Sequence, residues 1–143
     1  MTSIRQILER KPDIWAIDPD ATVLDALRLL DDKNVGALLV MKGERLVGIF
    51  SERDYARRMV LHGRSSKETL VKEVMTTEVF TISLDASAGE CMAHMTDRRI
   101  RHLPVLQGGR VVGVISIGDI VRAVMEDMRF TIRQLETYIR SGG

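Results

Sequence analysis

The sequence has a single cysteine, almost no net charge and no long apolar run. Cys91 alone cannot form an internal disulfide or a thiolate cluster for zinc, and the apolar residues at helical spacing around it predict a small core residue. The 21 basic and 20 acidic residues leave a net charge of +1, which gives no basis for a general attraction to nucleic acid or to an anionic membrane. We therefore expect no nucleic-acid partner and no membrane partner, and any anion site must be local.

The sequence also lacks the signs of export and of catalysis. No apolar stretch approaches the roughly 20 residues that cross a bilayer, and the amino terminus has no signal-peptide run, so we expect a cytoplasmic protein. The histidines His62, His94 and His102 are scattered, and no HExxH, GxSxG, GxxxxGKS/T or GxGxxG motif occurs. We expect no enzymatic activity, no metal site and no required cofactor.

What the sequence does contain is an internal repeat. A shift of 65 residues aligns residues 17–54 with residues 82–119 without a gap, and many positions that differ exchange like for like. The same hydrophobic pattern therefore occurs twice in one chain. Positions that are identical in both copies include Ile17/Ile82, Leu38/Leu103, Val40/Val105, Gly48/Gly113, Ser51/Ser116 and Asp54/Asp119.

Each copy predicts the element order β-α-β-β-α. Thr22 and Ser87 are candidate helix N-caps with an acid three residues on, and both hairpin connections contain glycine. In the first copy the predicted elements are a short strand at 14–17, a helix after Thr22, strands at 37–41 and 46–50, and a helix at 54–61. In the second copy they are a short strand at 79–82, a helix after Ser87, strands at 102–106 and 111–115, and a helix at 119–128.

Neither copy can bury the apolar face of its strands alone, so the two copies should pack against each other. The predicted fold is α+β, with two tandem β-α-β-β-α motifs packed sheet to sheet with pseudo-twofold symmetry. The length suits one module with one sizeable core. We expect residues 1–143 to form this module, with motif 1 at about 7–62, motif 2 at about 74–128 and a C-terminal helix at about 130–140.

A heptad of the form Gly-φ-φ-Ser-x-x-Asp, in which φ is apolar, occurs once in each copy, at 48–54 and 113–119. Each heptad lies where a strand ends and a helix begins, so a ligand there would meet free backbone N–H groups and the positive end of the helix dipole. With the string RHLPV at 101–105, the two heptads resemble those of CBS domains, named after cystathionine β-synthase, over nearly the whole chain. A second interpretation stays open, because Ser-x-x-Asp is itself a helix-capping pattern.

The resemblance implies a non-catalytic regulatory module that binds an adenine nucleotide, of the AMP, ADP, ATP, NAD or S-adenosylmethionine class, in clefts shared by the two motifs. In such a cleft the Asp accepts hydrogen bonds from the ribose hydroxyls, and the leading apolar piece of the other motif faces the adenine. Asp119 and Ser116 would thus work with residues 14–16, and Asp54 and Ser51 with residues 79–81. The implied ribose and phosphate residues are Ser51, Arg53, Asp54, Arg101, His102, Ser116, Gly118 and Asp119, and the implied adenine pocket is Ile14, Trp15, Ala16, Val79, Phe80, Thr81 and Val114. Trp15 could equally be a core aromatic.

The copies differ where phosphate is expected. Residues 36–37 are Gly and Ala, whereas the equivalent Arg101 and His102 offer a guanidinium for phosphate oxygens and an imidazole that can carry a proton near neutral pH. Arg53 could reach phosphate, although Glu52 beside it would oppose an anion unless it turns outward. Arg98 and Arg99 are either phosphate ligands or a solvated helix end. The sequence therefore predicts two inequivalent clefts.

Residues 130–140 have no counterpart in the first copy. Ile132, Leu135 and Ile139 would form a narrow apolar stripe on a helix, which needs a surface to cover it. That surface is either a second chain, which gives a homodimer, or the same chain, on which the tail folds back as a lid. The resemblance also implies a homodimer, because CBS pairs commonly associate through their signature helices. The alternative function is a protein-interaction scaffold with unoccupied clefts.

Overall fold

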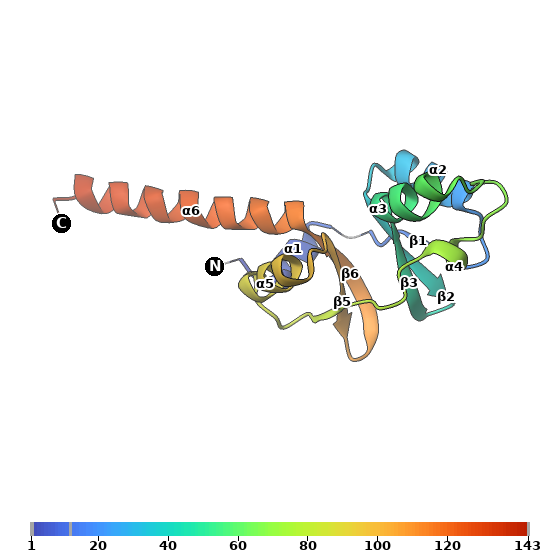
Figure 1. Ribbon diagram of the computed structural model, residues 1–143. Helices are drawn as coiled ribbons and strands as arrows, with labels where there is room; N and C mark the ends of the chain where they lie inside the picture. The colour runs from blue at the N-terminus through green and yellow to red at the C-terminus, as the bar shows by residue number, and fades with distance from the viewer. Residues whose placement is uncertain (1, 12, 143) are drawn as a thin grey trace.

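A computed structural model describes residues 2–11 and 13–142. It contains two three-stranded sheets, one in each repeat, and each has its strands in sequence order (Figure 1). The first strand of each sheet pairs parallel to the second, and the second pairs antiparallel to the third. This arrangement confirms the predicted α+β fold of two tandem motifs. The strands are β1 (Ala16–Ile17), β2 (Ala37–Lys42), β3 (Arg45–Ser51), β4 (Ile82–Ser83), β5 (His102–Gln107) and β6 (Arg110–Ser116).

The first long helix of each repeat begins and ends in the same way. The hydroxyl of Thr22 accepts from the backbone N–H of Asp25 at the start of α2 (Val23–Lys33), and Ser87 does the same at the start of α5 (Ala88–Arg98). Both N-caps were predicted. Each helix ends on a residue in the left-handed region with φ 53°, at Asn34 and Arg99, which terminates the helix before the next strand.

The short helices that precede the repeats are exchanged between them. Helix α1 (Ile4–Glu9) packs on the core of the second repeat, and α4 (Val71–Val74) packs on the core of the first. The buried apolar residues accordingly form two clusters, one containing Phe50 and one containing Ile115. The expectation of one sizeable core is therefore wrong. Each sheet instead buries its inner face against its own helices and the leading helix of the other repeat.

Cys91 lies within the second cluster and is fully buried. Burial raises the pKa of its thiol to about 11, so it remains protonated at neutral pH. The prediction of a core residue is confirmed.

The signature glycines allow the exchanged segments to cross the third strand of the other repeat. A Cβ on Gly48 would lie 2.6 Å from Met75 Sδ and 2.9 Å from the carbonyl oxygen of Thr76. The backbone of Ile49 forms two hydrogen bonds with Thr76, of 3.0 and 2.9 Å. A Cβ on Gly113 would lie 2.5 Å from Leu8 Cδ2. Glycine at these positions is required by close approach rather than by an unusual backbone angle.

The two signature helices differ. After Ser51 the chain forms α3 (Glu52–Asp54), the π-helical segment η1 (Tyr55–Met59) and the 3-10 turn η2 (Val60–His62). After Ser116 it forms one uninterrupted helix of 24 residues, α6 (Ile117–Arg140), so the separate helices predicted at 119–128 and 130–140 are a single helix. Figure 1 shows α6 projecting away from both sheets. Every residue from Met128 to Arg140 is exposed, so the tail does not fold back as a lid.

No helix in the described parts of the chain is both long and apolar enough to cross a membrane.

Candidate functional site

The two signature serines and aspartates form matching hydrogen-bonded rings. Asp54 donates its backbone N–H to Ser51 Oγ over 3.2 Å, and Asp54 Oδ2 accepts from the backbone N–H of Ser51 over 2.9 Å. The distances for Asp119 and Ser116 are 3.2 and 2.8 Å. The capping interpretation is therefore confirmed. It also fixes each carboxylate at the start of a helix, with only 8% of Asp54 and 7% of Asp119 exposed.

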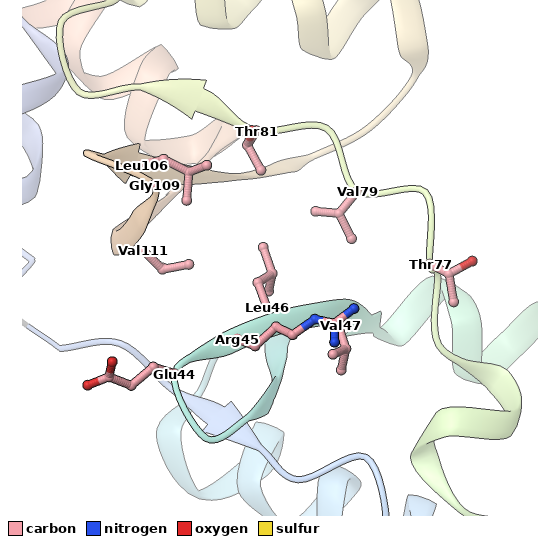
Figure 2. A pocket seen from close by; sticks show the side chains of 10 residues that line it. All are labelled: Glu44, Arg45, Leu46, Val47, Thr77, Val79, Thr81, Leu106, Gly109 and Val111. Atoms are coloured by element: carbon pink, nitrogen blue, oxygen red, sulfur yellow. The ribbon is translucent and has the colours of Figure 1, made fainter.

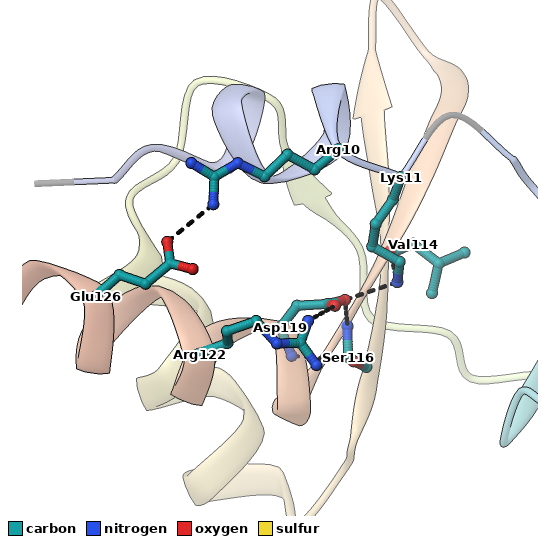
Figure 3. Close-up of polar contacts among 7 residues, drawn as sticks. All are labelled: Arg10, Lys11, Val114, Ser116, Asp119, Arg122 and Glu126. Atoms are coloured by element: carbon teal, nitrogen blue, oxygen red, sulfur yellow. Dashed lines mark hydrogen bonds and ion pairs between the residues drawn. The ribbon is translucent and has the colours of Figure 1, made fainter.

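Each signature aspartate is also contacted from the other repeat. Thr76 Oγ1 donates to Asp54 Oδ1 over 3.0 Å. Lys11 Nζ donates to Asp119 Oδ2 over 2.7 Å and to the carbonyl oxygen of Val114 over 3.2 Å (Figure 3). Lys11 and Thr76 are themselves 65 residues apart, so the two contacts are equivalent in the repeat. They lie in the chain segments that lead to residues 14–16 and 79–81, which is the pairing that shared clefts require.

Asp119 sits in a strongly cationic setting. Burial by itself would raise its pKa, but hydrogen bonds from Lys11 and Ser116 and the charge of Lys11 outweigh that effect, so the pKa of Asp119 is lowered. Arg122 Nη1 lies 3.6 Å from Asp119 Oδ1 (Figure 3). Asp119 is therefore a fixed, ionised acceptor at neutral pH, and Lys11 holds one of its two oxygens.

The surroundings of Asp54 are different. The only cation within ion-pair distance among the described residues is Arg58, whose Nε lies 3.9 Å from Asp54 Oδ1. Arg58 Nη1 is already committed, because it donates to the carbonyl oxygens of Val74 and Met75 over 3.1 and 2.7 Å. A neutral hydroxyl, from Thr76, is thus the closest cross-repeat contact of Asp54.

The residues expected near phosphate are distributed over several places. Arg53 Nη1 donates to the carbonyl oxygen of Arg99 over 2.8 Å, at the C-terminal end of α5. A Cβ on Gly36 would lie 3.2 Å from Glu52 Oε1 and 3.4 Å from His102 Cε1, so both side chains approach the place where Gly36 has no side chain. The glycine of one repeat therefore makes room for the histidine of the other.

His102 is largely enclosed, and its pKa is lowered, first by burial and then by the charge of Lys11. The imidazole is therefore held in its neutral form at neutral pH, and proton uptake beside a phosphate stays a prediction. Arg101 and Lys11 both lower the pKa of His102 and Asp119 raises it, so all four groups share one electrostatic environment.

The aromatic residues of the leading segments form a second equivalent pair. The ammonium of Lys33 lies 4.4 Å from the ring centre of Trp15, and the guanidinium of Arg98 lies 4.0 Å from the ring centre of Phe80. Trp15 also packs against the first core cluster, as a core aromatic would, whereas Phe80 is 44% exposed. Arg98 therefore covers an aromatic face.

A cavity of about 370 Å³ lies between the two β-hairpins (Figure 2). Val79 and Thr81, two residues of the predicted adenine pocket, line it, but neither signature aspartate does, so the adenine pocket stays a prediction. Its other lining residues are Glu44, Arg45, Leu46, Val47, Thr77, Leu106, Gly109 and Val111. The cavity therefore lies between the tips of the two hairpins and the segment that follows Thr76, and neither Asp54 nor Asp119 lines it.

The remaining predicted residues are mostly exposed. Ile14 and Ala16 are exposed, and Val114 contributes its carbonyl oxygen to Lys11. Gly118 is exposed, and a Cβ there would contact only Ser116 Oγ, at 3.7 Å. In residues 2–11 and 13–142, no group of three or more His, Cys, Asp or Glu side chains could hold a metal ion.

Comparison with known proteins gives one consistent answer. The family model described as CBS domain matches residues 4–61 and again residues 71–126. The chain is 43% identical over 134 residues to the CBS domain-containing protein CBSX3, mitochondrial, of Arabidopsis thaliana. The aligned region spans 90% of this chain but only 65% of that protein.

Two solved structures show the same fold. A putative signal-transduction protein with CBS domains from Burkholderia ambifaria MC40-6 is 47% identical, with a TM-score of 0.85 over 88% of this chain and 96% of the other. The CBS domain pair of protein MJ0100, in complex with 5′-methylthioadenosine and S-adenosyl-L-methionine, is 26% identical, with a TM-score of 0.76 over 89% of this chain and 98% of the other.

Proposed function

The chain belongs to the CBS-domain family, and from that premise we propose that it is a non-catalytic sensor of an adenine nucleotide or of S-adenosylmethionine. One observation carries this proposal. Two buried carboxylates, Asp54 and Asp119, lie at equivalent strand-to-helix junctions, and each is contacted by the segment that leads the other repeat. A ligand bound at either carboxylate would touch both repeats, so its binding free energy would depend on how they are placed.

The chemistry of each junction suits a ribose. A carboxylate only accepts hydrogen bonds, whereas the two ribose hydroxyls can donate them. The capping rings keep Asp54 and Asp119 in place, so a ligand would not have to order them. The solved MJ0100 domain pair, which holds two adenosine derivatives, supports the ligand class. The cytoplasmic location remains a prediction, since the relative CBSX3 is named as mitochondrial.

A thermal-shift panel tests the proposal. AMP, ADP, ATP, NAD and S-adenosylmethionine are compared with UMP and UTP as controls for the phosphate alone. A ligand at about 100 times its Kd should add about 2.7 kcal/mol to the free energy of unfolding. Stabilisation by at least one adenine compound, absent with its uracil counterpart, is the expected result. No adenine-dependent shift, together with no nucleotide in a native mass spectrum of the purified protein, would contradict it.

The second candidate is a protein-interaction scaffold with unoccupied clefts. One observation favours it, because both carboxylates already have hydrogen-bond partners from the chain itself. The same thermal-shift panel separates the two functions.

We propose further that the working unit is a homodimer formed through α6. Six exposed apolar side chains follow one another along this helix at spacings of four and three residues, namely Val121, Met125, Met128, Ile132, Leu135 and Ile139. Of this α6 stripe, the sequence predicted the last three as an apolar stripe, and Met125 and Met128 as part of an exposed apolar face of the signature helix. The alternation of four and three is that of the a and d positions of a coiled coil, which a second helix covers. These side chains are 47% to 71% exposed, so a second copy is the proposed occupant.

The charges beside the stripe favour an antiparallel pair. In a register that pairs Met128 with the partner subunit's Ile132, Arg122 lies beside the partner subunit's Glu136. Twofold symmetry repeats this contact, so two opposite-charge pairs flank one interface.

A parallel pair offers no such match. In a parallel pair, Arg129 would lie opposite the partner subunit's Val124, and Glu136 would lie opposite the partner subunit's Thr131. The antiparallel pair does place Arg129 beside its own copy at the centre, where solvent screens the repulsion.

A further inference from the structure

The two signature aspartates have unequal cross-repeat partners. Asp54 accepts from a hydroxyl, that of Thr76, whereas Asp119 accepts from an ammonium, that of Lys11, over 2.7 Å. Thr76 and Lys11 are equivalent positions of the repeat. The repeat has therefore placed a charged group beside one signature aspartate and a neutral group beside the other, at equivalent positions of the chain.

More cations gather around Asp119. Arg122 Nη1 lies 3.6 Å from Asp119 Oδ1, and Arg101 is close enough to share an environment with Lys11 and His102. The carboxylate of Asp119 offsets the positive charge of these groups. The Lys11 side chain is 38% exposed, and its ammonium pairs with this carboxylate. If a ligand takes the carboxylate, Lys11 must find another anion or remain partly desolvated without one.

We propose that Lys11 is a phosphate-binding residue that restricts the Asp119 cleft to phosphorylated adenine nucleotides, while the Asp54 cleft also accepts adenine ligands that lack a phosphate. This inference rests on the proposed adenine-ligand function and assigns a ligand class to each cleft.

The physical basis is an exchange of partners. The ribose hydroxyls of the ligand replace Lys11 on Asp119, and the ligand's phosphate replaces Asp119 on Lys11, so both charges stay paired. A nucleoside supplies the hydroxyls but no anion, so its binding would cost Lys11 its direct ion pair with Asp119 and put no phosphate in its place, while Arg122 stays close to Asp119. At Asp54 the displaced group is the neutral Thr76 hydroxyl, so no anion is needed there.

The test is calorimetric titration with AMP, ADP, ATP and adenosine. The protein carries Asp54→Asn, which weakens the other cleft and leaves Asp119 as the site observed. Three changes at Lys11 are compared, namely Lys11→Met, which removes the charge, Lys11→Thr, which installs the residue of the other repeat, and Lys11→Arg, which retains the charge. Urea unfolding of each variant confirms that it is folded at the temperature of the titration.

The measured quantity is the ratio of the Kd for adenosine to the Kd for the best-binding phosphorylated nucleotide. Lys11→Met and Lys11→Thr should lower this ratio by about tenfold, the scale of one charge-assisted hydrogen bond, whereas Lys11→Arg should largely preserve it. An unchanged ratio in Lys11→Met, or equal weakening of adenosine and nucleotide, would overturn the role of Lys11 while leaving adenine binding intact. Failure of every adenine compound to bind the unmodified chain would overturn the proposed function as well.

Discussion

Gly48 and Thr76 approach each other so closely that a Cβ on Gly48 would lie 2.9 Å from the Thr76 carbonyl oxygen. The crossing of these two segments holds the leading segment of the second repeat against β3 and places Thr76 beside Asp54. The signature glycine thus shapes the candidate site indirectly, because its lack of a side chain lets the Thr76 segment pack closely against β3.

Gly48→Ala should destabilise the fold by about 2 kcal/mol, because the added methyl meets a backbone oxygen that cannot turn aside. Gly113→Ala should cost less, since its neighbour is the end of the flexible Leu8 side chain. Gly89→Ala is the matched control, in a helix where the new methyl has only Ser87 Oγ within 4 Å, at 3.8 Å, and should stabilise by about 0.5 kcal/mol. Urea unfolding measures all three, and an equal free energy of unfolding for Gly48→Ala and Gly89→Ala would contradict the close-approach argument.

Asp119→Asn and Asp54→Asn should each weaken ligand binding at one cleft by about 1.5 to 3 kcal/mol, the scale of a hydrogen bond to a charged group. Asparagine is preferable to alanine here. Each aspartate also accepts from the backbone N–H of the signature serine, so an alanine would cost about 1 kcal/mol of helix capping in addition.

Calorimetric titration with the best ligand of the adenine panel decides the role of the aspartates. Each single variant should lose one class of site, and the double variant should lose both. If both single variants keep the affinity and stoichiometry of the unmodified protein, the aspartates do not hold the ligand.

The ion pair between Lys11 and Asp119 should make stability depend on pH in the acid range. The pKa of Asp119 is lower in the folded chain than its ordinary value of 3.8, so the folded state holds its proton less tightly than the unfolded state. The stabilisation is therefore fully present well above pH 3.8 and is lost as the pH falls below that value through the folded pKa.

Lys11→Met removes the principal attraction at Asp119, so the difference in the free energy of unfolding between the unmodified chain and this variant should be largest near neutral pH. It should shrink as the pH falls below about 4. Urea unfolding at several pH values measures the difference, and Lys33→Met is the control, at a cation that lies over Trp15 and pairs only with the largely exposed carboxylate of Asp32. A difference that grows toward acid pH would contradict the assignment.

The repeat alone predicted most of the fold. The two N-caps, the hairpins and the order of elements along the chain follow from the local pattern, which is why Thr22, Ser87 and the strands at 37–41 and 102–106 were placed within one or two residues. The exchange of α1 and α4 was not predictable in the same way. Apolar periodicity says that Ile4 and Val71 are buried, but it does not say against which repeat.

The signatures predicted the two candidate aspartates, and the residues that contact these aspartates from the other repeat lie outside the signatures. Lys11 and Thr76 precede the aligned segments, and only an alignment extended upstream of Ile17 would have paired them. Their importance comes from the exchange, which brings residues more than 20 positions away in sequence onto Asp54 and Asp119. The enclosed position of His102 was likewise invisible, because it depends on the absence of a side chain at Gly36 in the other repeat.

The α6 stripe supports the last prediction, which concerns assembly. The full chain should be a dimer by light scattering, and Leu135→Glu should make it monomeric, because a charge within an apolar seam is costly to desolvate. Thr137→Glu is the matched control, since Thr137 lies on the side of α6 away from the stripe and should leave the dimer intact.

Charge reversal then tests the direction of the pair. Arg122→Glu and Glu136→Arg should each weaken the dimer, by placing like charges beside each other, and the combined variant should restore it, because the pairs are reversed together. Arg122 also lies 3.6 Å from Asp119, so the melting temperature of each variant is compared at concentrations below the dimer Kd to separate folding from assembly.

Restoration in the combined variant requires the antiparallel register, in which these two residues meet across the interface. A combined variant as weak as the sum of its single changes would assign a different register. A full chain that is monomeric, or a dimer that persists undiminished in a chain ending at Asp127, would show that the α6 stripe is not the interface.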